Sequence, residues 1–436
     1  MGLTVQVWRT ALPHGNDVQV AVRPWAINLL LNGEAPSFTF DPLGRLHAAF
    51  VGGVNYRRSL DNRVLSKWAE MTRGGRRRQR RWLDPGEAKA LVDAAYSLAR
   101  QTAAQAGLAP PAVRAALHRL GQWDWEALEA NARRFAQIYT PVGILPPDQY
   151  LALVLQATHG CSHNACTFCT FYRGIPFRIK TPEEFRQHTR DVVDFFGPAL
   201  AMRRSIFLGD ANALVIPMPR LSALWDVLAE ALGGDEQGTL TGVERGSTGG
   251  PPVAHGGEIL GAAGGRGLGL PVFAFVDAFH VERKSAADWQ ALAARGLRRV
   301  YIGMESGHDP LLRWLNKPGD AQDVLDAVRQ LKAAGLQVSV IVMLGVGGER
   351  YAAGHVEDTV RLLNAMPLGR GDIVYFSDFV QHPEAPYAQL AAEAGVQPLD
   401  EAAVRRQELA IRRGFVPRDP RIPPQFSRYA IEEFIY

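Results

Sequence analysis

From residue 150 onward, apolar segments of strand length alternate with segments of helical periodicity. Strands joined through helices pair in parallel, because the chain crosses one face of the sheet before it returns. Six such units would form an incomplete (β/α)6 barrel, since a closed barrel of this kind needs eight. The predicted strands span 151–157, 204–208, 271–277, 298–303, 337–344 and 372–379, and the predicted helices span 181–195, 219–232, 284–295, 309–316, 320–334 and 354–365.

The residues before this alternation follow a different pattern, with short strands first and helices after them. We therefore expect three regions: a small α+β N-terminal domain over 1–145, the barrel over 146–387, and a helical or extended C-terminal extension over 388–436. In the N-terminal region the clearest strands are predicted at 18–22, 37–40 and 45–51, and the helices at 88–104, 111–120 and 125–138.

Residues 233–270 interrupt the alternation and are rich in glycine. A segment of this composition buries too little apolar surface to offset the entropy that is lost when it becomes ordered. We therefore expect a flexible insertion between the second helix and the third strand of the barrel.

A basic run, RGGRRRQRR, precedes the first predicted helix. It has two interpretations: a patch that contacts the phosphates of RNA, or a solvated loop. No aromatic residues are interleaved with the arginines, so the composition favours the solvated loop. The arginines of this run are Arg73, Arg76, Arg77, Arg78, Arg80 and Arg81.

The overall composition is that of an ordinary globular chain. Of its 436 residues, 47% are hydrophobic and 21% are charged, which is enough for a sizeable core. The net charge of +4 is too small to indicate nucleic acid by itself. No apolar run reaches the roughly 18 residues of a transmembrane helix, and the N-terminus lacks the features of a signal peptide. We therefore expect a cytoplasmic protein without a membrane anchor.

The only three cysteines, Cys161, Cys166 and Cys169, follow directly after the first predicted barrel strand. Thiols gathered in this way indicate one shared ligand rather than disulfides. A structural zinc site needs four ligands, and His163 could be the fourth. A 4Fe–4S cluster could instead bind three cysteines and leave one iron open to another molecule. The cysteines alone do not decide between zinc and a cluster.

The cysteine loop reads C-x4-C-x2-C, with Phe168 before its last cysteine. It resembles the cluster loop of the radical S-adenosylmethionine (radical SAM) superfamily, whose commonest form is C-x3-C-x2-C. The resemblance implies a partial TIM-like barrel that binds one 4Fe–4S cluster and S-adenosylmethionine (SAM). It also implies that Cys161, Cys166 and Cys169 are the cluster ligands. An oxygen-sensitive cluster agrees with a reducing, cytoplasmic location.

Two further strand ends resemble segments that contact SAM in this family. Gly209 and Asp210, after the second strand, resemble a Gly-Gly-Glu segment whose acid receives the ammonium group of SAM, although a Gly-Asp turn is common after strands. Gly345 and Gly347 follow the fifth strand, where the resemblance implies contact with adenine. Glycines at such a position allow a planar ring to approach the backbone closely.

The fourth strand leads into the run YIGMESGHDPLLRWLNKP. It resembles the core of the methylthiotransferase and oxygen-independent coproporphyrinogen oxidase branch, which implies that Glu305 and Ser306 contact SAM. The structural alternative is an acidic residue near the start of the helix at Asp309-Pro310. His382, after the sixth strand, could take part in substrate chemistry, although loop histidines are more often structural.

The resemblance implies a radical enzyme. One electron from reduced flavodoxin or ferredoxin would cleave SAM, and the resulting 5′-deoxyadenosyl radical would abstract hydrogen from an unidentified substrate. The chain has no further cysteines for a second cluster and no D-x-H-x-x-G cobalamin segment. These absences argue against methylthiolation and against cobalamin-dependent methyl transfer. The alternatives are a zinc-stabilised RNA-binding protein and a catalytically inactive partner protein with the same fold.

Overall fold

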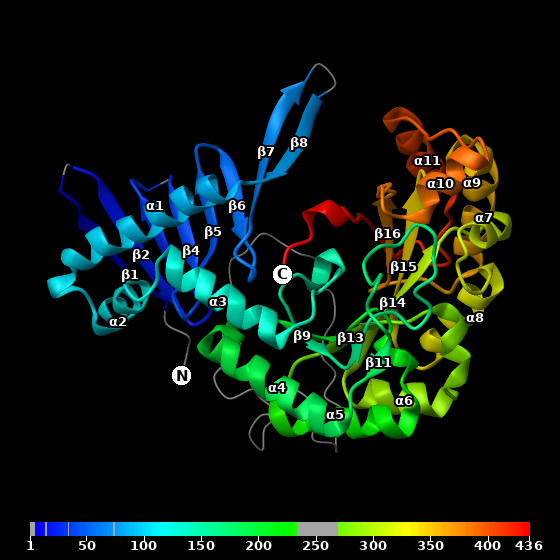
Figure 1. The fold of residues 1–436 in the computed structure, drawn as a ribbon, viewed down its shortest axis with the longest axis horizontal. Helices are drawn as coiled ribbons and strands as arrows, with labels where there is room; N and C mark the ends of the chain where they lie inside the picture. The colour runs from blue at the N-terminus through cyan, green and yellow to red at the C-terminus, as the bar shows by residue number, and fades with distance from the viewer. Residues whose placement is uncertain (1–4, 14, 34, 73–74, 233–268) are drawn as a thin grey trace.

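The computed structural model contains an antiparallel sheet covered by helices and a barrel of parallel strands (Figure 1). It describes residues 5–13, 15–33, 35–72, 75–232 and 269–436. Arg73 and nearly all of the predicted glycine-rich insertion lie outside the described residues.

The N-terminal sheet has eight strands, and each strand pairs antiparallel with the next one along the chain. Tight turns fix the register locally. Between two of the strands, Val51 pairs with Val54 across Gly52 and Gly53, whose φ angles of +57° and +78° suit a two-residue hairpin turn. The strands are β1 (Gln6–Ala11), β2 (Asp17–Arg23), β3 (Ala26–Leu31), β4 (Ser37–Phe40), β5 (Leu46–Val51), β6 (Val54–Arg58), β7 (Val64–Thr72) and β8 (Gly75–Trp82).

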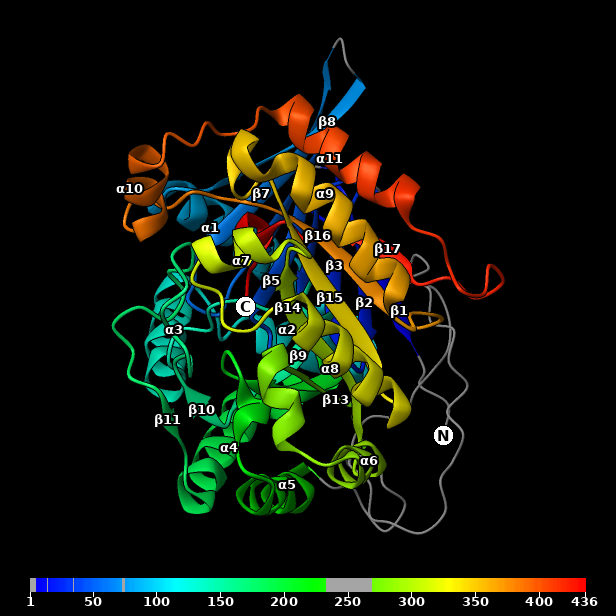
Figure 2. The ribbon, with the colours of Figure 1, turned by 90° about the vertical axis from the view of Figure 1, so that its right-hand side faces the viewer.

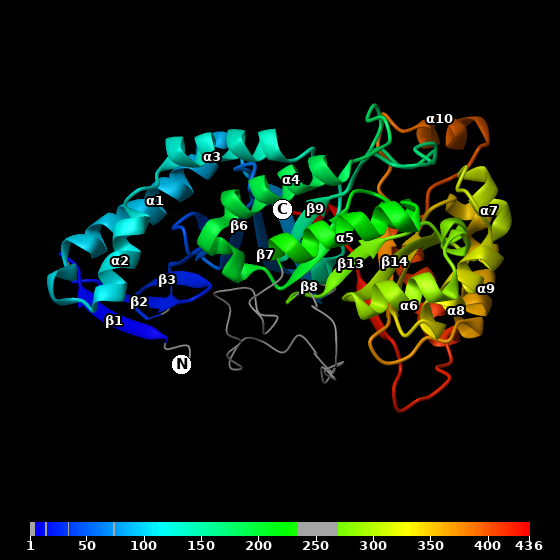
Figure 3. The same ribbon diagram turned by 90° about the horizontal axis from the view of Figure 1, so that it is seen from below.

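Helices α1 (Pro85–Ala104), α2 (Pro111–Leu120) and α3 (Trp125–Ile138) lie along the sheet (Figure 3). The start of α1 is fixed by a capping box, in which Asp84 and Glu87 each accept the backbone N–H of the other. In α3, Leu128 packs into the core of the sheet and Phe135 packs into the core of the barrel. This helix therefore joins the two parts of the molecule.

Seven parallel strands form the barrel in the order β17-β16-β15-β14-β13-β12-β9. Every residue of β9 and β12 is buried, as expected for strands covered on both faces. The helices pack around the outside of the strands (Figure 2). The strands are β9 (Ala152–Gln156), β12 (Ser205–Gly209), β13 (Val272–Phe275), β14 (Leu297–Glu305), β15 (Gln337–Leu344), β16 (Ile373–Asp378) and β17 (Gln425–Arg428); the helices are α4 (Pro182–Phe196), α5 (Met218–Leu232), α6 (Ala286–Ala294), α7 (Asp309–Trp314), α8 (Ala321–Ala333), α9 (Gly348–Ala365), α10 (Pro386–Glu393) and α11 (Glu401–Gly414).

The barrel stays open between β17 and β9, which do not pair. At this free edge the backbone N–H of Val154 donates to the Tyr436 hydroxyl (2.9 Å), and the Tyr139 hydroxyl donates to the Val154 carbonyl (2.9 Å). These phenol groups take the role of a neighbouring strand by satisfying the backbone of β9. The C-terminal tail therefore extends from one edge of the sheet to the other.

The structure confirms the predicted α/β fold, its six βα units and its mixed N-terminal region. It adds a seventh parallel strand, β17, which the sequence analysis did not predict. The prediction of a solvated loop for RGGRRRQRR was wrong for Gly75–Trp82, which forms β8 and pairs with β7. This pairing uses backbone groups, so the arginine-rich composition gave no sign of it. The boundaries at 145 and 387 stay predictions. Within the described residues, no helix is long and apolar enough to cross a membrane.

Candidate active site

A cavity of about 190 Å³ lies where the C-terminal ends of the barrel strands meet the cysteine loop. Parallel barrels carry their active sites at this end, because loops from several strands converge there. Three cysteines, three acids and a lysine border it, so we call it the thiol cavity. The residues used below that line it are Cys161, Cys166, Phe168, Cys169, Phe275, Asp277, Gly303, Glu305, Lys317, Ile341, Met343, His382 and Tyr429.

The cysteine loop is closed at its base by two short strands, β10 (Thr158–His159) and β11 (Arg178–Ile179), which pair antiparallel. Gly160 begins the loop with a φ of +69°, and a Cβ at this position would lie 2.6 Å from the carbonyl oxygen of Ile175. Glycine is therefore required for the loop to fold back on itself. The Arg173 side chain holds the turn around the last cysteine by donating to the Cys169 carbonyl (2.9 Å).

All three thiols line the cavity, and burial raises the pKa of Cys169 and raises that of Cys166 to about 12. The positive charge of Lys317 opposes both shifts. Buried thiols beside a cation suit ligation, which binds the thiolate form. The donor set therefore fits a bound cluster.

The zinc alternative requires the ligands of one ion to lie close together. Among the described residues, no group of three or more histidine, cysteine, aspartate or glutamate side chains has that arrangement. The imidazole of His163 instead lies with Nε2 2.9 Å from the carbonyl oxygen of Asn316. The described side chains therefore do not show the arrangement that a zinc site requires.

A buried ion pair stands at the end of β14. Lys317 Nζ lies 3.4 Å from Glu305 Oε1, and the two side chains are 14% and 9% exposed. Burial raises the pKa of Glu305 against the opposing charge of Lys317. Burial also works against the charge of Lys317, but Glu305 keeps the pKa of that lysine above its usual value. Burying two ions costs several kcal/mol of desolvation each, so their position at a cavity indicates a functional role.

The backbone of Glu305 is unusual, with a φ of +59° that is uncommon for a residue other than glycine. Such conformations gather at functional sites. Gly303 leaves the space that the ion pair occupies, because a Cβ there would lie 2.5 Å from Glu305 Oε1 and 3.3 Å from Lys317 Nζ.

Ser306 lies behind the cavity and does not line it. Its side chain is fully buried, and its hydroxyl accepts the backbone N–H of His308 (3.0 Å) and hydrogen-bonds His355 Nδ1 (2.8 Å). His308 Nδ1 in turn lies 2.6 Å from Asp358 Oδ2. Because His355 and Asp358 belong to α9, these contacts fix the end of β14 and hence the direction of Glu305.

Asp277 is a second acid in the cavity, and the sequence analysis missed it. Asn212 Nδ2 donates to Asp277 Oδ2 (2.7 Å), and His280 Nδ1 lies 3.7 Å from the same oxygen. Burial opposes the ionised form, but the hydrogen bond from His280 and the charge of Lys317 lower the pKa of Asp277 overall. The sequence feature that could have predicted Asp277 is an acid directly after the apolar strand sequence VFAFV.

Gly209 and Asp210 do not line the thiol cavity. The Asp210 carboxylate accepts a hydrogen bond from Gln156 Nε2 (3.2 Å), and burial raises the pKa of Asp210 to about 6. The Gly209 carbonyl accepts the backbone N–H of Ala157 (2.7 Å). The two residues therefore connect β12 to the chain after β9, and their contact with SAM stays a prediction.

Gly345 and Gly347 also lie beside the cavity and not in its wall. The N–H of Gly345 donates to Gln407 Oε1 (2.8 Å), and the N–H of Gly347 donates to the Tyr387 hydroxyl (3.0 Å). Their backbone donors thus contact α10 and α11, and a role in binding adenine stays a prediction. Phe168, by contrast, lines the cavity.

Much of the remaining cavity wall is apolar. Phe275, Ile341, Met343 and Tyr429 contribute to this wall, and His382 also lines the cavity. The cavity therefore combines charged groups with apolar surface that could receive the carbon skeleton of a substrate.

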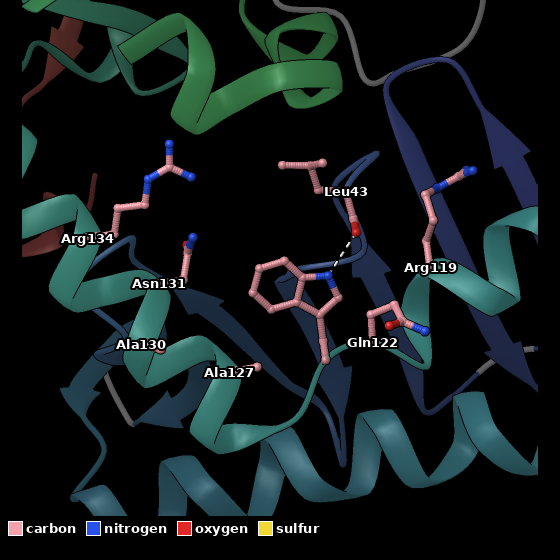
Figure 4. A pocket seen from close by; sticks show the side chains of 8 residues that line it. Leu43, Arg119, Gln122, Ala127, Ala130, Asn131 and Arg134 are labelled. Atoms are coloured by element: carbon pink, nitrogen blue, oxygen red, sulfur yellow. Dashed lines mark hydrogen bonds between the residues drawn. The ribbon is translucent and has the colours of Figure 1, made fainter. Parts of the chain in front are cut away.

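A wider hollow on the N-terminal domain measures about 560 Å³ (Figure 4). Trp123 lines it, and its indole N–H donates to the Leu43 carbonyl (2.8 Å). Arg119 and Arg134 stand on opposite sides of it in Figure 4. Among the residues that the structure describes, no acid, thiol or histidine lines this hollow, so the thiol cavity is the better candidate for catalysis.

The fold and the thiol cavity define a class of protein: a partial α/β barrel with three thiols and a buried ion pair at one cavity. Residues 248–363 match the family model described as the Radical SAM superfamily. This part of the chain is therefore similar to the radical SAM superfamily, whose members bind a 4Fe–4S cluster and SAM. The matched region contains Glu305 and Lys317 but begins after the three cysteines.

Several solved structures of radical SAM enzymes are similar to this chain. The cobalamin-dependent enzyme OxsB is 15% identical over 61% of this chain and 31% of its own, with a TM-score of 0.35. The methyltransferase TsrM from Kitasatospora setae is 15% identical over 56% of this chain and 39% of its own, with a TM-score of 0.37. Coproporphyrinogen III oxidase (HemN) from Escherichia coli is 14% identical over 64% of this chain and 53% of its own, with a TM-score of 0.37. The chain thus spans about a third to a half of these proteins. No curated protein sequence matches it.

Proposed function

We propose that this chain binds one 4Fe–4S cluster through Cys161, Cys166 and Cys169 and uses SAM to abstract hydrogen from a substrate in the thiol cavity. The observation that carries this proposal is that all three cysteines of the chain line one cavity together with a buried ion pair. Three thiols leave one iron of a cluster open to an outside ligand. The charges of the ion pair match the amino and carboxylate groups of an amino acid.

When bound, the cluster and SAM supply a 5′-deoxyadenosyl radical after one electron arrives from a carrier such as flavodoxin or ferredoxin. The chain's own residues would bind and orient the reactants. Glu305 and Asp277 would attract the ammonium group of SAM, and Lys317 would attract its carboxylate. The contacts of Ser306 with α9 would keep Glu305 directed into the cavity.

The apolar wall of the cavity would keep water away from the radical and hold a C–H bond of the substrate near it. Hydrogen abstraction would then give 5′-deoxyadenosine and a substrate radical, whose fate sets the reaction subclass. His382, which also lines the cavity, is a candidate for a polar contact with the substrate. We place this reaction in the cytoplasm, where a cluster of this kind stays reduced.

The test is anaerobic reconstitution with iron and sulfide, followed by addition of dithionite and SAM. We expect a brown protein with about four irons per chain that produces 5′-deoxyadenosine. Cys166→Ala should abolish the product because it removes one ligand of the cluster. Ser162→Ala is the matched control, since it changes the same loop without removing a thiol.

The alternatives give different results in the same experiment. A zinc-stabilised RNA-binding protein would be colourless and would hold about one zinc per chain. A catalytically inactive partner protein would assemble the cluster but release no 5′-deoxyadenosine. Unchanged product formation by Cys166→Ala would contradict the assignment of this residue as a ligand.

A further inference from the structure

A second, enclosed cavity lies between the N-terminal sheet and the barrel, and we call it the arginine cavity. The volume open to the centre of a water molecule is about 30 Å³. It is bordered by residues near β5 and β6, by the segment before β12 and by the C-terminal tail. Its charged or titratable lining residues, apart from tyrosines, are Asp41, Arg45, His47, Arg57, Arg58 and Arg203.

Four arginines share this cavity with one side-chain carboxylate, and that carboxylate is already occupied. Asp41 accepts from Arg45 Nε (2.6 Å) and from the backbone N–H groups of Arg45 (2.9 Å) and Leu43 (3.0 Å). Arg58 donates to neutral oxygens, including the Leu46 carbonyl (2.6 Å). Within the described part of the chain, no other aspartate or glutamate lines the cavity. Burying several like charges against fewer counter-charges is unfavourable.

Several donors of these arginines have no partner. Among the described residues, Arg45 Nη2 and Arg203 Nε are buried without a hydrogen bond, and Arg57 makes no side-chain hydrogen bond or ion pair. The Arg45 side chain is only 1% exposed. The guanidinium carbons of Arg45 and Arg203 lie 5.8 and 4.3 Å from the centre of the same ring, that of Phe196. Unsatisfied cationic donors therefore converge from both parts of the molecule.

The sequence builds this convergence with a bulge at the start of β5. Thr39 pairs with Ala48 and Phe40 pairs with Leu46, so His47 is an extra residue in the ladder. A bulge redirects side chains, and here His47 faces the same cavity as its neighbour Arg45. Burial and the nearby charge of Arg57 hold the pKa of His47 well below its usual value.

We propose that the arginine cavity binds a tetrahedral oxyanion, inorganic phosphate or sulfate, which joins the N-terminal domain to the barrel. Such an ion accepts hydrogen bonds in several directions and supplies the missing negative charge. Its oxygens all lie one bond from the central atom, so it fits a space that also holds about two waters. A nucleotide is too large for this space. The proposal does not depend on the proposed catalytic function.

The experiment measures thermal unfolding of the full chain in chloride, phosphate, sulfate and acetate at one ionic strength. Phosphate or sulfate should raise the unfolding midpoint in a saturable way, and chloride should not, because a ligand of the folded state stabilises it by mass action. Comparison of the phosphate and sulfate curves identifies the preferred ion. A similar rise with acetate alone would indicate a carboxylate site and would overturn the proposal.

Two variants locate the effect. Arg57→Gln and Arg203→Gln should each lose most of the phosphate response, whereas Arg100→Gln, an exposed arginine of α1 outside the cavity, should keep it. In chloride, Arg57→Gln should unfold no earlier than the unaltered protein, because it relieves repulsion among cations. If the unaltered protein shows no saturable response, or if both cavity variants respond like Arg100→Gln, the cavity is not an oxyanion site.

Discussion

The two polar cavities of this protein differ in how their charges are balanced. In the thiol cavity, the Lys317 ammonium lies 3.4 Å from the Glu305 carboxylate, and the Asp277 carboxylate accepts a hydrogen bond from Asn212. In the arginine cavity, among the described residues, four guanidinium groups face one side-chain carboxylate, that of Asp41, which is already engaged. The first cavity thus holds charge of both signs, and the second holds an excess of one sign.

This difference indicates two kinds of ligand. A cavity with a paired acid and base can exchange its internal contact for the ammonium and carboxylate of a zwitterion, so it suits the amino acid part of SAM. A cavity with unpaired cations has too few counter-charges of its own and therefore favours binding of an external anion. Charge changes should therefore have opposite consequences in the two cavities: removal of a cation should destabilise the first and spare the second.

The largest effect on stability is expected from Lys317→Met. This variant leaves the Glu305 carboxylate buried without its cation, and breaking a buried pair in this way costs roughly 3–5 kcal/mol. Urea unfolding of the cluster-free protein measures the loss. The double variant Glu305→Gln with Lys317→Met should recover most of the stability, because no charge remains buried, but it should still fail to bind SAM. If the double variant is as unstable as Lys317→Met, the unpaired charge of Glu305 is not the cause of the lost stability.

The barrel was predictable because its signals are local and repeated. Strand 337–344 was predicted with the observed bounds of β15, since an apolar run between two helices has few other solutions. The three cysteines also indicated the position of the site, because the chain contains no others. β17 could not be predicted from its own sequence: it is a short polar segment whose strand conformation depends on pairing with β16.

The polar parts of both cavities were predicted less well. Glu305 was found through its strand, but Lys317 lies twelve positions later and meets it only because the chain turns back through α7. The arginine cavity depends on Arg45 and Arg203, which are far apart in the sequence and belong to different parts of the molecule. No periodicity links them, so only the packing of the N-terminal domain on the barrel reveals the cluster.

A smaller and more selective effect is expected from Gly303→Ala. The new Cβ would lie 2.5 Å from Glu305 Oε1, and the flexible end of that side chain can move away. We therefore expect little change in unfolding free energy but a loss of about tenfold in SAM affinity, equivalent to about 1.4 kcal/mol. Equilibrium dialysis of the reconstituted enzyme measures it. Gly107→Ala, where a Cβ would meet nothing within 4 Å, is the matched control. Equal affinities of the two variants would contradict a role for Glu305 in binding SAM.

The smallest effect concerns pH and distinguishes the arginine cavity from the thiol cavity. Burial and the surrounding arginines keep the pKa of His47 below its unfolded value of about 6.5, so the unfolded chain binds this proton first as the pH falls. Stability should therefore decrease from pH 6.5 downward, by about 1 kcal/mol at pH 5.5 for this one ring. His47→Gln should remove that part of the decrease in chloride buffer, whereas His118→Gln, an exposed histidine of α2, should not.

Phosphate sharpens this last prediction because it changes the field around His47. A bound dianion offsets the charges of the arginines, so protonation of His47 becomes easier in the folded state and the loss of stability between pH 6.5 and 5.5 should shrink. The relevant comparison is the slope of unfolding free energy against pH in phosphate and in chloride, for the unaltered protein and for His47→Gln. If the two anions give the same slope for the unaltered protein, no anion occupies the space that His47 faces. If the slopes in phosphate and in chloride differ by the same amount in His47→Gln as in the unaltered protein, a group other than His47 takes up the proton.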